Sequence, residues 1–280
     1  KEKQALAKIP WGTLLLICGV GVLMNVVIEM GGIDLINVMS KTAGMGDENH
    51  NRQPAASMYM ALQMVQTMME IDFAHRDEIV KQFAANDRFF LHVMMAGAES
   101  VLASVKKVPY STVMVAMGGN GVKFGTRFAG TGARWFTVDA PLIEGLFLKP
   151  TYTKDDLLGF LGDSCVTEVY GLGGMSASAG PGYVVLTGST FADSLQRAAD
   201  ARKVCVAEHR FAPIPWDGGQ GFPVGVDARK VVGLNILPTS HGGGTLKNGG
   251  QGTMGAAKLP MDCFKQGLIA INEILMNEAK

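Results

Sequence analysis

The chain has 280 residues and a formal net charge of zero, from 25 basic and 25 acidic residues. This balance excludes the basic excess of a typical nucleic-acid-binding protein, and the length is sufficient for a sizeable core. Charged residues make up 18% of the sequence, below the usual ~25%, whereas glycine and methionine are frequent, with 36 and 17 copies. The composition favours extensive buried surface and contacts between subunits, so we expect an oligomer.

The four cysteines, Cys18, Cys165, Cys205 and Cys263, are widely separated and form no CxxC pair. Isolated cysteines of this kind are typical of reduced thiols in a cytosolic protein, not of a disulfide framework or a zinc site. We therefore expect a cytoplasmic protein that uses no metal or other cofactor.

The first apolar stretch, residues 9–28, contains no charged side chain and follows Lys1, Lys3 and Lys8. Its length is sufficient to cross a bilayer, and basic residues often precede an anchor or signal segment. The alternative is a helix buried inside a globular subunit or at an oligomer interface. We favour the buried helix and expect no membrane partner.

A polar run at residues 46–52 follows and includes Glu48, His50 and Arg52. Rigid scaffolds often carry polar function on such loops. We predict catalytic roles for Glu48 and His50 and a substrate-binding role for Arg52. The run could also be an ordinary capped loop, or hold a metal through Asp47 and its neighbours, although the spacing matches no specific ligand template.

Helical periodicity continues over residues 54–70, 76–90 and 91–105. In the first of these helices, Met58, Leu62, Val65 and Met69 fall on one stripe, which predicts a core-facing surface because methionine stripes are mostly core filler.

From Pro109 the sequence becomes β-branched and apolar, which predicts strands over residues 111–117 and 134–138. Between them, residues 118–133 form a glycine-rich loop. Residues 183–187 are expected to form another strand. Thr190 is then expected to begin a helix that runs to Glu208 and to form a capping box with Asp193, and a closing helix begins at Pro260.

The loop at residues 118–133, with the residue that follows it, carries Asn120, Arg127 and Arg134. Glycine allows an anion to approach backbone N–H groups closely, and arginine offers a planar charged fork to carboxylate or phosphate. We predict that all three residues bind substrate. The alternative is a pair of hairpin turns with two surface arginines.

A second glycine-rich loop is predicted over residues 162–182, with Asp163, Ser164 and Glu168 near its start. Backbone N–H groups in such a loop can form an anion nest. Asp163 and Glu168 are candidate catalytic residues that would orient an amine or a metal, and Ser164 is a candidate binding residue. No GxSxG elbow is present, which argues against a serine triad.

The third glycine-rich stretch, residues 239–257, contains His241 and Gln251. A flexible loop of this length inside a compact domain is uncommon, which favours a role in binding a ligand or partner. We predict that both residues bind substrate.

These elements predict a mixed α/β fold. Residues 1–107 would form a mainly helical region, and residues 108–280 a mixed α/β region with glycine-rich anion-binding loops at strand ends, where open α/β sheets place ligands.

The ordered motifs also resemble a known family, the YlbE-like family, from about Gly31 to the C-terminus. The segments that carry the resemblance are GGIDLINVMSKTAGMGDENHNR, NDRFFL, NGVKFGTRFAGTGARWF, GDSCVTEVYGLGG, VGVDARKVV and GQGTMGAAKLPMDCF. Members of this family are longer and have a glycine-rich N-terminal region that is missing here. The sequence also departs from the family pattern at Gly119, where an arginine is usual, and at residues 239–244.

The resemblance implies a subunit of oxamate carbamoyltransferase in anaerobic allantoin breakdown, acting with an FdrA-like partner on carbamoyl phosphate and oxamate. In this reading Arg127 and Arg134 clamp anions, Glu48 and His50 orient or exchange a proton, and Asp163 and Glu168 position the amide nitrogen or a metal. The alternatives are a non-catalytic scaffold subunit, a membrane-anchored protein and a metal-dependent amidohydrolase.

Overall fold

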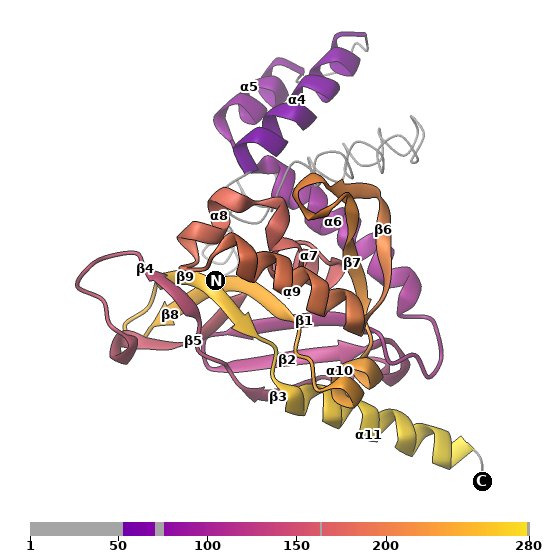
Figure 1. Ribbon diagram of the computed structural model, residues 1–280. Coiled ribbons are helices and arrows are strands. Elements are labelled where there is room, and N and C mark those ends of the chain that lie inside the picture. The colour runs from indigo at the N-terminus through magenta and orange to yellow at the C-terminus, as the bar shows by residue number, and fades with distance from the viewer. Residues whose placement is uncertain (1–52, 71–75, 163, 279–280) are drawn as a thin grey trace, which may run out of the picture.

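The computed structural model describes residues 53–70, 76–162 and 164–278, and Figure 1 shows their arrangement. The described helices are α4 (Gln53–Glu70), α5 (Arg76–Ala85), α6 (Phe89–Val105), α7 (Cys165–Tyr170), α8 (Pro181–Leu186), α9 (Phe191–Val204), α10 (Ala228–Leu234) and α11 (Met261–Glu278). Short 3-10 turns are η1 (Ala129–Thr131), η2 (Lys154–Asp156), η3 (Gly174–Ala179) and η4 (Pro215–Asp217). The strands are β1 (Met114–Asn120), β2 (Lys123–Phe128), β3 (Phe136–Asp139), β4 (Glu144–Phe147), β5 (Leu157–Gly162), β6 (Cys205–Ile214), β7 (Gln220–Val226), β8 (Thr239–Leu246) and β9 (Gln251–Lys258).

Within these ranges, seven strands form one antiparallel sheet in the order β3-β2-β1-β5-β8-β9-β4, and β6 pairs with β7 in a separate ribbon. The described chain begins with helices and continues with groups of strands and further helices, which confirms the predicted mixed α/β class. The division at residue 107 stays a prediction. Because the described sheet is antiparallel, the placement rule for ligands in doubly wound parallel sheets does not locate a site here.

The main core lies between the sheet and the helices that cover it. Phe128 is fully buried. The centroid of its ring lies 5.9 Å from the ring centroid of Phe136 and 5.8 Å from that of Phe264. Phe264 belongs to α11, so this aromatic cluster fixes the last helix against β2 and β3. Aromatic side chains bury large apolar areas, which makes such contacts a major source of stability.

A second buried cluster joins α4 and α6 to the edge of α7 and β7. It contains Met60, Met64, Phe90 and Met94, together with Phe222 of β7. Figure 1 shows α4 and α5 extending away from the sheet, with α6 between them and the rest of the molecule. The helical segment is therefore anchored to the α/β part chiefly through α6.

The prediction that the stripe containing Met58, Leu62 and Met69 faces the core is wrong. Met58, Leu62 and Met69 are 67%, 63% and 76% exposed, whereas Met60 and Met64 are buried. Because apolar residues surround most of this helix, periodicity alone does not determine which side faces the core.

The glycine-rich loops are mostly regular structure. Residues 118–133 contain most of the β1–β2 hairpin and η1, residues 162–182 contain α7 and η3, and residues 239–257 form the β8–β9 hairpin. The strand predicted at residues 183–187 is also wrong, since most of it lies in α8. A short apolar run cannot be assigned to helix or strand by periodicity alone.

Two helix predictions are confirmed at their N-termini. The Thr190 hydroxyl accepts a hydrogen bond from the Asp193 N–H, and the Asp193 carboxylate accepts from the Thr190 N–H, forming the expected capping box of α9. This helix ends at Val204 and β6 follows directly, so the prediction of a helix to Glu208 was too long. The closing helix is α11, which begins directly after Pro260.

Among the described helices, none is by itself long and apolar enough to cross a membrane. Taken together, α5 and α6 are long and apolar enough, but the chain bends by 100° between these two helices. The predicted buried or membrane-spanning segment at residues 9–28 lies outside the described residues.

Candidate functional site

A small cavity lies where the end of β5, the start of α7, the middle of β8 and the start of β9 meet. Its volume is about 120 Å³, several times the ~30 Å³ that one water occupies in the liquid. It therefore has room for a molecule of a few heavy atoms. The lining residues are Leu161, Gly162, Ser164, Cys165, Glu168, His241, Gly242, Gly243 and Gln251.

Glu168 is the buried charged group of this cavity, with 1% of its surface exposed. Its Oε2 accepts a hydrogen bond from the Gly174 N–H at 2.9 Å, and its Oε1 accepts from the His241 N–H at 3.2 Å. Hydrogen bonds to an ionised group are among the stronger ones in proteins. The two contacts join α7, η3 and β8 and hold the carboxylate in one orientation.

Gly171 and Gly174 allow the backbone to place the Gly174 N–H beside the Glu168 carboxylate. Gly171 takes a left-handed conformation (φ 111°) and ends α7, a position that glycine occupies without steric cost. A Cβ on Gly174 would lie 2.5 Å from the Thr239 carbonyl oxygen, so a side chain is excluded there. The glycines after α7 thus allow the backbone to turn and to pack directly against β8.

His241 lies on β8 and is 2% exposed. The glycines beside it make room for larger neighbours: a Cβ on Gly242 would lie 2.6 Å from the Phe160 ring, and a Cβ on Gly243 would lie 2.8 Å from the Gln251 amide nitrogen. The glycine run in β8 is therefore explained by close packing inside the sheet, not by the anion loop that the sequence suggested.

Ser164 and Gln251 complete the polar lining. Ser164 immediately precedes α7, and its carbonyl oxygen accepts from the Thr167 hydroxyl at 3.0 Å. The Gln251 amide nitrogen donates to the Thr253 carbonyl oxygen at 3.3 Å. A serine hydroxyl, an imidazole, a primary amide and a carboxylate together can donate to and accept from a small amide or carboxylate ligand.

Four residues predicted from the sequence therefore lie around one cavity: Ser164, Glu168, His241 and Gln251. Sequence reasoning missed Cys165 and Leu161, which carry no local signal for a site. Of the remaining candidates, Glu48, His50, Arg52 and Asp163 lie outside the described residues.

Asn120, Arg127 and Arg134 are not among the residues that line this cavity. The Asn120 Oδ1 accepts from the N–H groups of Val122 and Lys123, at 3.0 and 2.8 Å, and so closes the β1–β2 turn. Their predicted binding roles stay predictions.

The two arginines have partners outside this cavity. The Arg127 Nη2 donates to the Gly132 carbonyl oxygen at 2.9 Å, and its guanidinium lies 5.7 Å from the Trp135 ring centroid. Arg134 is exposed, 3.6 Å from Glu273. The described lining of the cavity contains no lysine or arginine, so an anion held there would depend on neutral donors or on groups outside that set.

Metal ligation has no support in this part of the chain. Within residues 53–70, 76–162 and 164–278, no group of three or more His, Cys, Asp or Glu side chains could hold a metal ion. The metal-site alternative rested on residues 47–50, which lie outside those ranges.

Relatives of known sequence include two proteins of Escherichia coli K12. The chain is 31% identical to the oxamate carbamoyltransferase subunit AllG over 86% of its own length and 59% of the relative. It is 29% identical to the uncharacterized protein YahG over 86% of its length and 52% of the relative. The chain thus spans between half and three-fifths of the length of these relatives.

A solved structure shares the fold. The crystal structure of a conserved protein of unknown function from Enterococcus faecalis V583 matches with a TM-score of 0.75 and 31% identity, covering 85% of this chain and 58% of that one.

Family membership follows from a match that extends over more than half of the chain. Residues 4–164 match the family described as oxamate carbamoyltransferase subunit AllG, in agreement with the resemblance that the sequence motifs indicated. The chain belongs to the AllG family of oxamate carbamoyltransferase subunits.

Proposed function

We propose that this chain is a subunit of a cytoplasmic carbamoyltransferase that interconverts oxalurate and phosphate with oxamate and carbamoyl phosphate. In the direction of breakdown, a phosphate oxygen forms a bond to the carbamoyl carbon, the C–N bond to the oxamate nitrogen breaks, and that nitrogen gains a proton. The proposal is supported by family membership and by one observation above all. Ser164 and Glu168 come from one segment of the chain, His241 and Gln251 from another that is distant in the sequence, and all four line one cavity.

The cavity suits the oxamate portion of the reaction. Its volume of about 120 Å³ admits a planar molecule of a few heavy atoms, and its buried carboxylate is an acceptor for an amide N–H. We assign Glu168 to orienting the oxamate nitrogen and assign Ser164, His241 and Gln251 to binding the carbonyl and carboxylate oxygens. Donors fixed in advance around an oxygen that gains charge are the main source of transition-state stabilisation in acyl-type transfers.

Phosphate needs cationic donors, and the described lining of this cavity has none. Arg52, Arg127 and Arg134 remain candidates from the sequence, with Glu48, His50 and Asp163 as proton-exchanging or positioning groups. We propose that an FdrA-like partner subunit takes part, and that the two substrates meet where the subunits assemble. Placing both substrates side by side would supply much of the rate acceleration.

The reaction is tested on the assembled enzyme. Carbamoyl phosphate formation from oxalurate and phosphate is measured for this chain with its partner subunits, before and after Ser164→Ala and His241→Gln. We expect kcat/KM to fall by about tenfold or more for each variant, since each removes a polar contact to substrate. Ser104→Ala, in the exposed part of α6, is the matched control and should leave kcat/KM unchanged.

A scaffold role is the second candidate, favoured by the lack of a lysine or arginine in the described cavity lining. It predicts that the chain is required for activity, while Ser164→Ala and His241→Gln leave kcat/KM at the wild-type value. That result would overturn our assignment of the cavity.

A further inference from the structure

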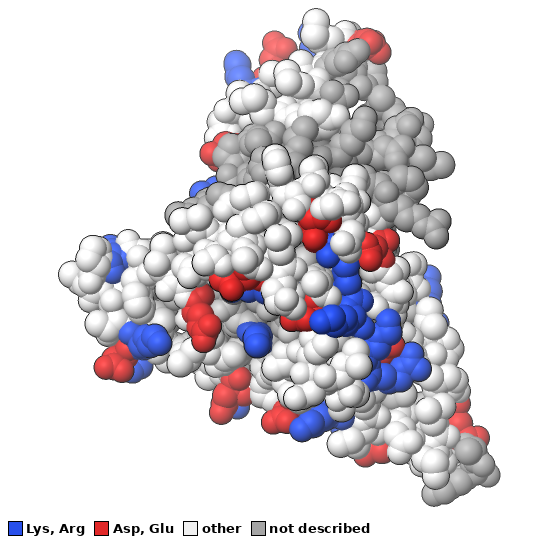
Figure 2. Space-filling model, viewed as in Figure 1, with Lys and Arg blue, Asp and Glu red and all other residues white. Residues whose placement is uncertain are grey.

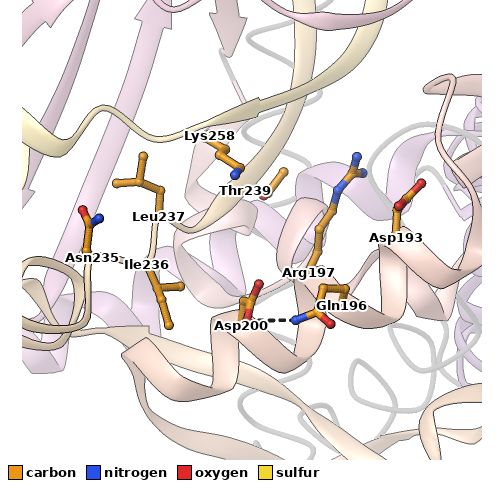
Figure 3. A pocket seen from close by; sticks show the side chains of 9 residues that line it. All are labelled: Asp193, Gln196, Arg197, Asp200, Asn235, Ile236, Leu237, Thr239 and Lys258. Atoms are coloured by element: carbon orange, nitrogen blue, oxygen red, sulfur yellow. Dashed lines mark hydrogen bonds between the residues drawn. The ribbon is translucent and has the colours of Figure 1, made fainter.

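A larger pocket, of about 450 Å³, lies between α9, the segment before β8 and the end of β9. This volume is within the range of small-molecule sites, about 300–1,000 Å³. The pocket is lined by Asp193, Gln196, Arg197, Asp200, Asn235, Ile236, Leu237, Thr239 and Lys258. Figure 3 shows the four α9 side chains on one side, with Lys258 and Thr239 facing them across the pocket.

The two carboxylates of the pocket already have hydrogen-bond partners on α9 or at its N-cap. The Asp193 carboxylate accepts from the N–H and the hydroxyl of Thr190, at 2.9 and 2.7 Å. The Asp200 Oδ1 accepts from the Gln196 amide at 3.0 Å and from the Lys203 amine at 2.8 Å. Asp200 is thus paired with a cation of the same helix, whereas the donors to Asp193 are neutral. The charge of Asp193 also acts on Arg197, and that of Asp200 on Lys258.

The two cations of the pocket, Arg197 and Lys258, have fewer partners than the carboxylates. The Arg197 Nη2 donates to the Ser189 hydroxyl at 2.6 Å, but the buried Nη1 has no hydrogen-bond partner among the described residues. Burial lowers the pKa of the Arg197 guanidinium, although the charges of Asp193 and Glu144 oppose this shift. In the part of the chain that the structure describes, neither Arg197 nor Lys258 has a carboxylate within 4.0 Å.

A buried guanidinium N–H without a partner costs free energy, and a bound acceptor would recover it. The fixed fork of arginine matches the oxygens of a carboxylate or phosphate. Lys258 lies directly opposite Thr239 in the β8–β9 register, so its charge lies at the same pocket. Ile236 and Leu237 give the opposite wall an apolar surface.

We propose that this pocket binds a small organic anion whose carboxylate or phosphate group is held by Arg197 and Lys258, with the apolar part of the ligand against Ile236 and Leu237. The site is separate from the cavity at Glu168. The proposal does not depend on the carbamoyltransferase function. Figure 2 shows lysine and arginine side chains near α9 and α10 interspersed with acidic ones, so recognition relies on local pairing and not on a broad basic surface.

The test is titration calorimetry of the purified chain with succinate and, separately, with inorganic phosphate. We expect saturable binding of at least one probe, weakened about tenfold by Arg197→Gln and by Lys258→Gln, because each removes a charged hydrogen bond. Lys265→Gln, an exposed lysine of α11, changes the net charge equally and should leave the affinity unchanged. Tighter binding of succinate would indicate a carboxylate ligand, and tighter binding of inorganic phosphate would indicate a phosphate ligand.

Two results would overturn the proposal: no saturable binding of either probe, or equal affinity in wild type and Lys258→Gln. Lys258 is exposed, so this variant decides the question even if Arg197→Gln fails to fold. Ser164→Ala distinguishes the sites, since it should leave binding at Arg197 intact. Loss of binding in Ser164→Ala alone would assign the probe to the cavity at Glu168.

Discussion

Glu168 has two roles in our account, as a wall of the cavity and as a structural connection. Its carboxylate accepts hydrogen bonds from backbone N–H groups of η3 and β8, so it joins α7 and the neighbouring η3 to a strand that is distant in the sequence. A buried carboxylate is retained only where such donors offset its loss of hydration. We therefore expect a substitution of Glu168 to change the stability of the fold as well as the proposed binding site.

Glu168→Gln tests the structural role. The amide is similar in size but carries a donor where one backbone N–H needs an acceptor, so we expect the free energy of unfolding to fall by ~1–3 kcal/mol. Urea unfolding measures the change. Glu273→Gln, at an exposed glutamate of α11, is the control and should change stability by less than ~1 kcal/mol. Equal stability of wild type and Glu168→Gln would show that a second acceptor oxygen at this position contributes nothing to stability.

Asp227 predicts a dependence of stability on pH. Burial alone would raise its pKa, but hydrogen bonds from Arg229 and Thr112 outweigh burial and lower the pKa below 3.8. Because the folded-state pKa is depressed, the stabilisation is fully present above the unfolded-state value and is lost as the pH falls through the folded-state value. We expect the melting temperature to decline below pH ~4.

Asp227→Asn provides the comparison for this pH profile. The variant should be less stable than wild type near neutral pH, and the difference should shrink as the pH falls below ~4. Thermal unfolding across the acid range measures both curves. A constant difference at every pH would contradict a role for the ionised carboxylate.

The sequence indicated several polar residues that line one cavity, but not that they meet there. Ser164, Glu168, His241 and Gln251 were predicted from polar residues set among glycines, and the fold brings them to one cavity. Arg127 was predicted by the same reasoning but does not line this cavity, and it contacts Gly132 and Trp135. Its binding role stays a prediction. Composition indicates which residues can bind an anion, whereas long-range strand pairing determines which of them meet.

At the scale of secondary-structure elements, features that depend on residues close in the sequence were predictable, and features that depend on distant residues were not. The capping box of α9 involves residues three apart and was identified correctly. The glycines of the β8–β9 hairpin predict a loop, because glycine is rare in strands. These glycines are required by neighbours from other elements, such as Phe160 of β5 beside Gly242, and no local pattern reports such contacts.

The contact between β4 and β9 offers a test of this explanation. A Cβ on Gly145 would lie 2.0 Å from the Met254 carbonyl oxygen, so Gly145→Ala must separate the two strands. We expect a loss of ~1–3 kcal/mol in the free energy of unfolding, the usual cost of overpacking. Denaturant titration measures it.

Gly233→Ala is the matched control for this substitution. Gly233 lies in α10, and a Cβ there would meet no atom within 4 Å. Alanine should stabilise the helix by ~0.5–1 kcal/mol. If Gly145→Ala were as well tolerated as Gly233→Ala, close strand packing would not be the reason for glycine at residue 145.

At the scale of the whole molecule, the helical segment and the sheet share contacts through α6 and α7, and the cavity lies at the start of α7. The chain spans 52% and 59% of its two relatives. Carbamoyl transfer is therefore a property to test on the assembled subunits, whereas binding of a small substrate at Glu168 can be tested on this chain.

The most direct test of the central claim is the affinity of oxamate for this chain, measured by titration calorimetry in wild type, Gln251→Ala and Gln266→Ala. Gln266 is an exposed residue of α11 and serves as the control. We predict saturable binding that Gln251→Ala weakens about tenfold, as expected for the loss of one or two hydrogen bonds to the bound ligand, and that Gln266→Ala leaves unchanged. Absence of saturable oxamate binding, or equal affinity in all three proteins, would contradict the assignment of this cavity.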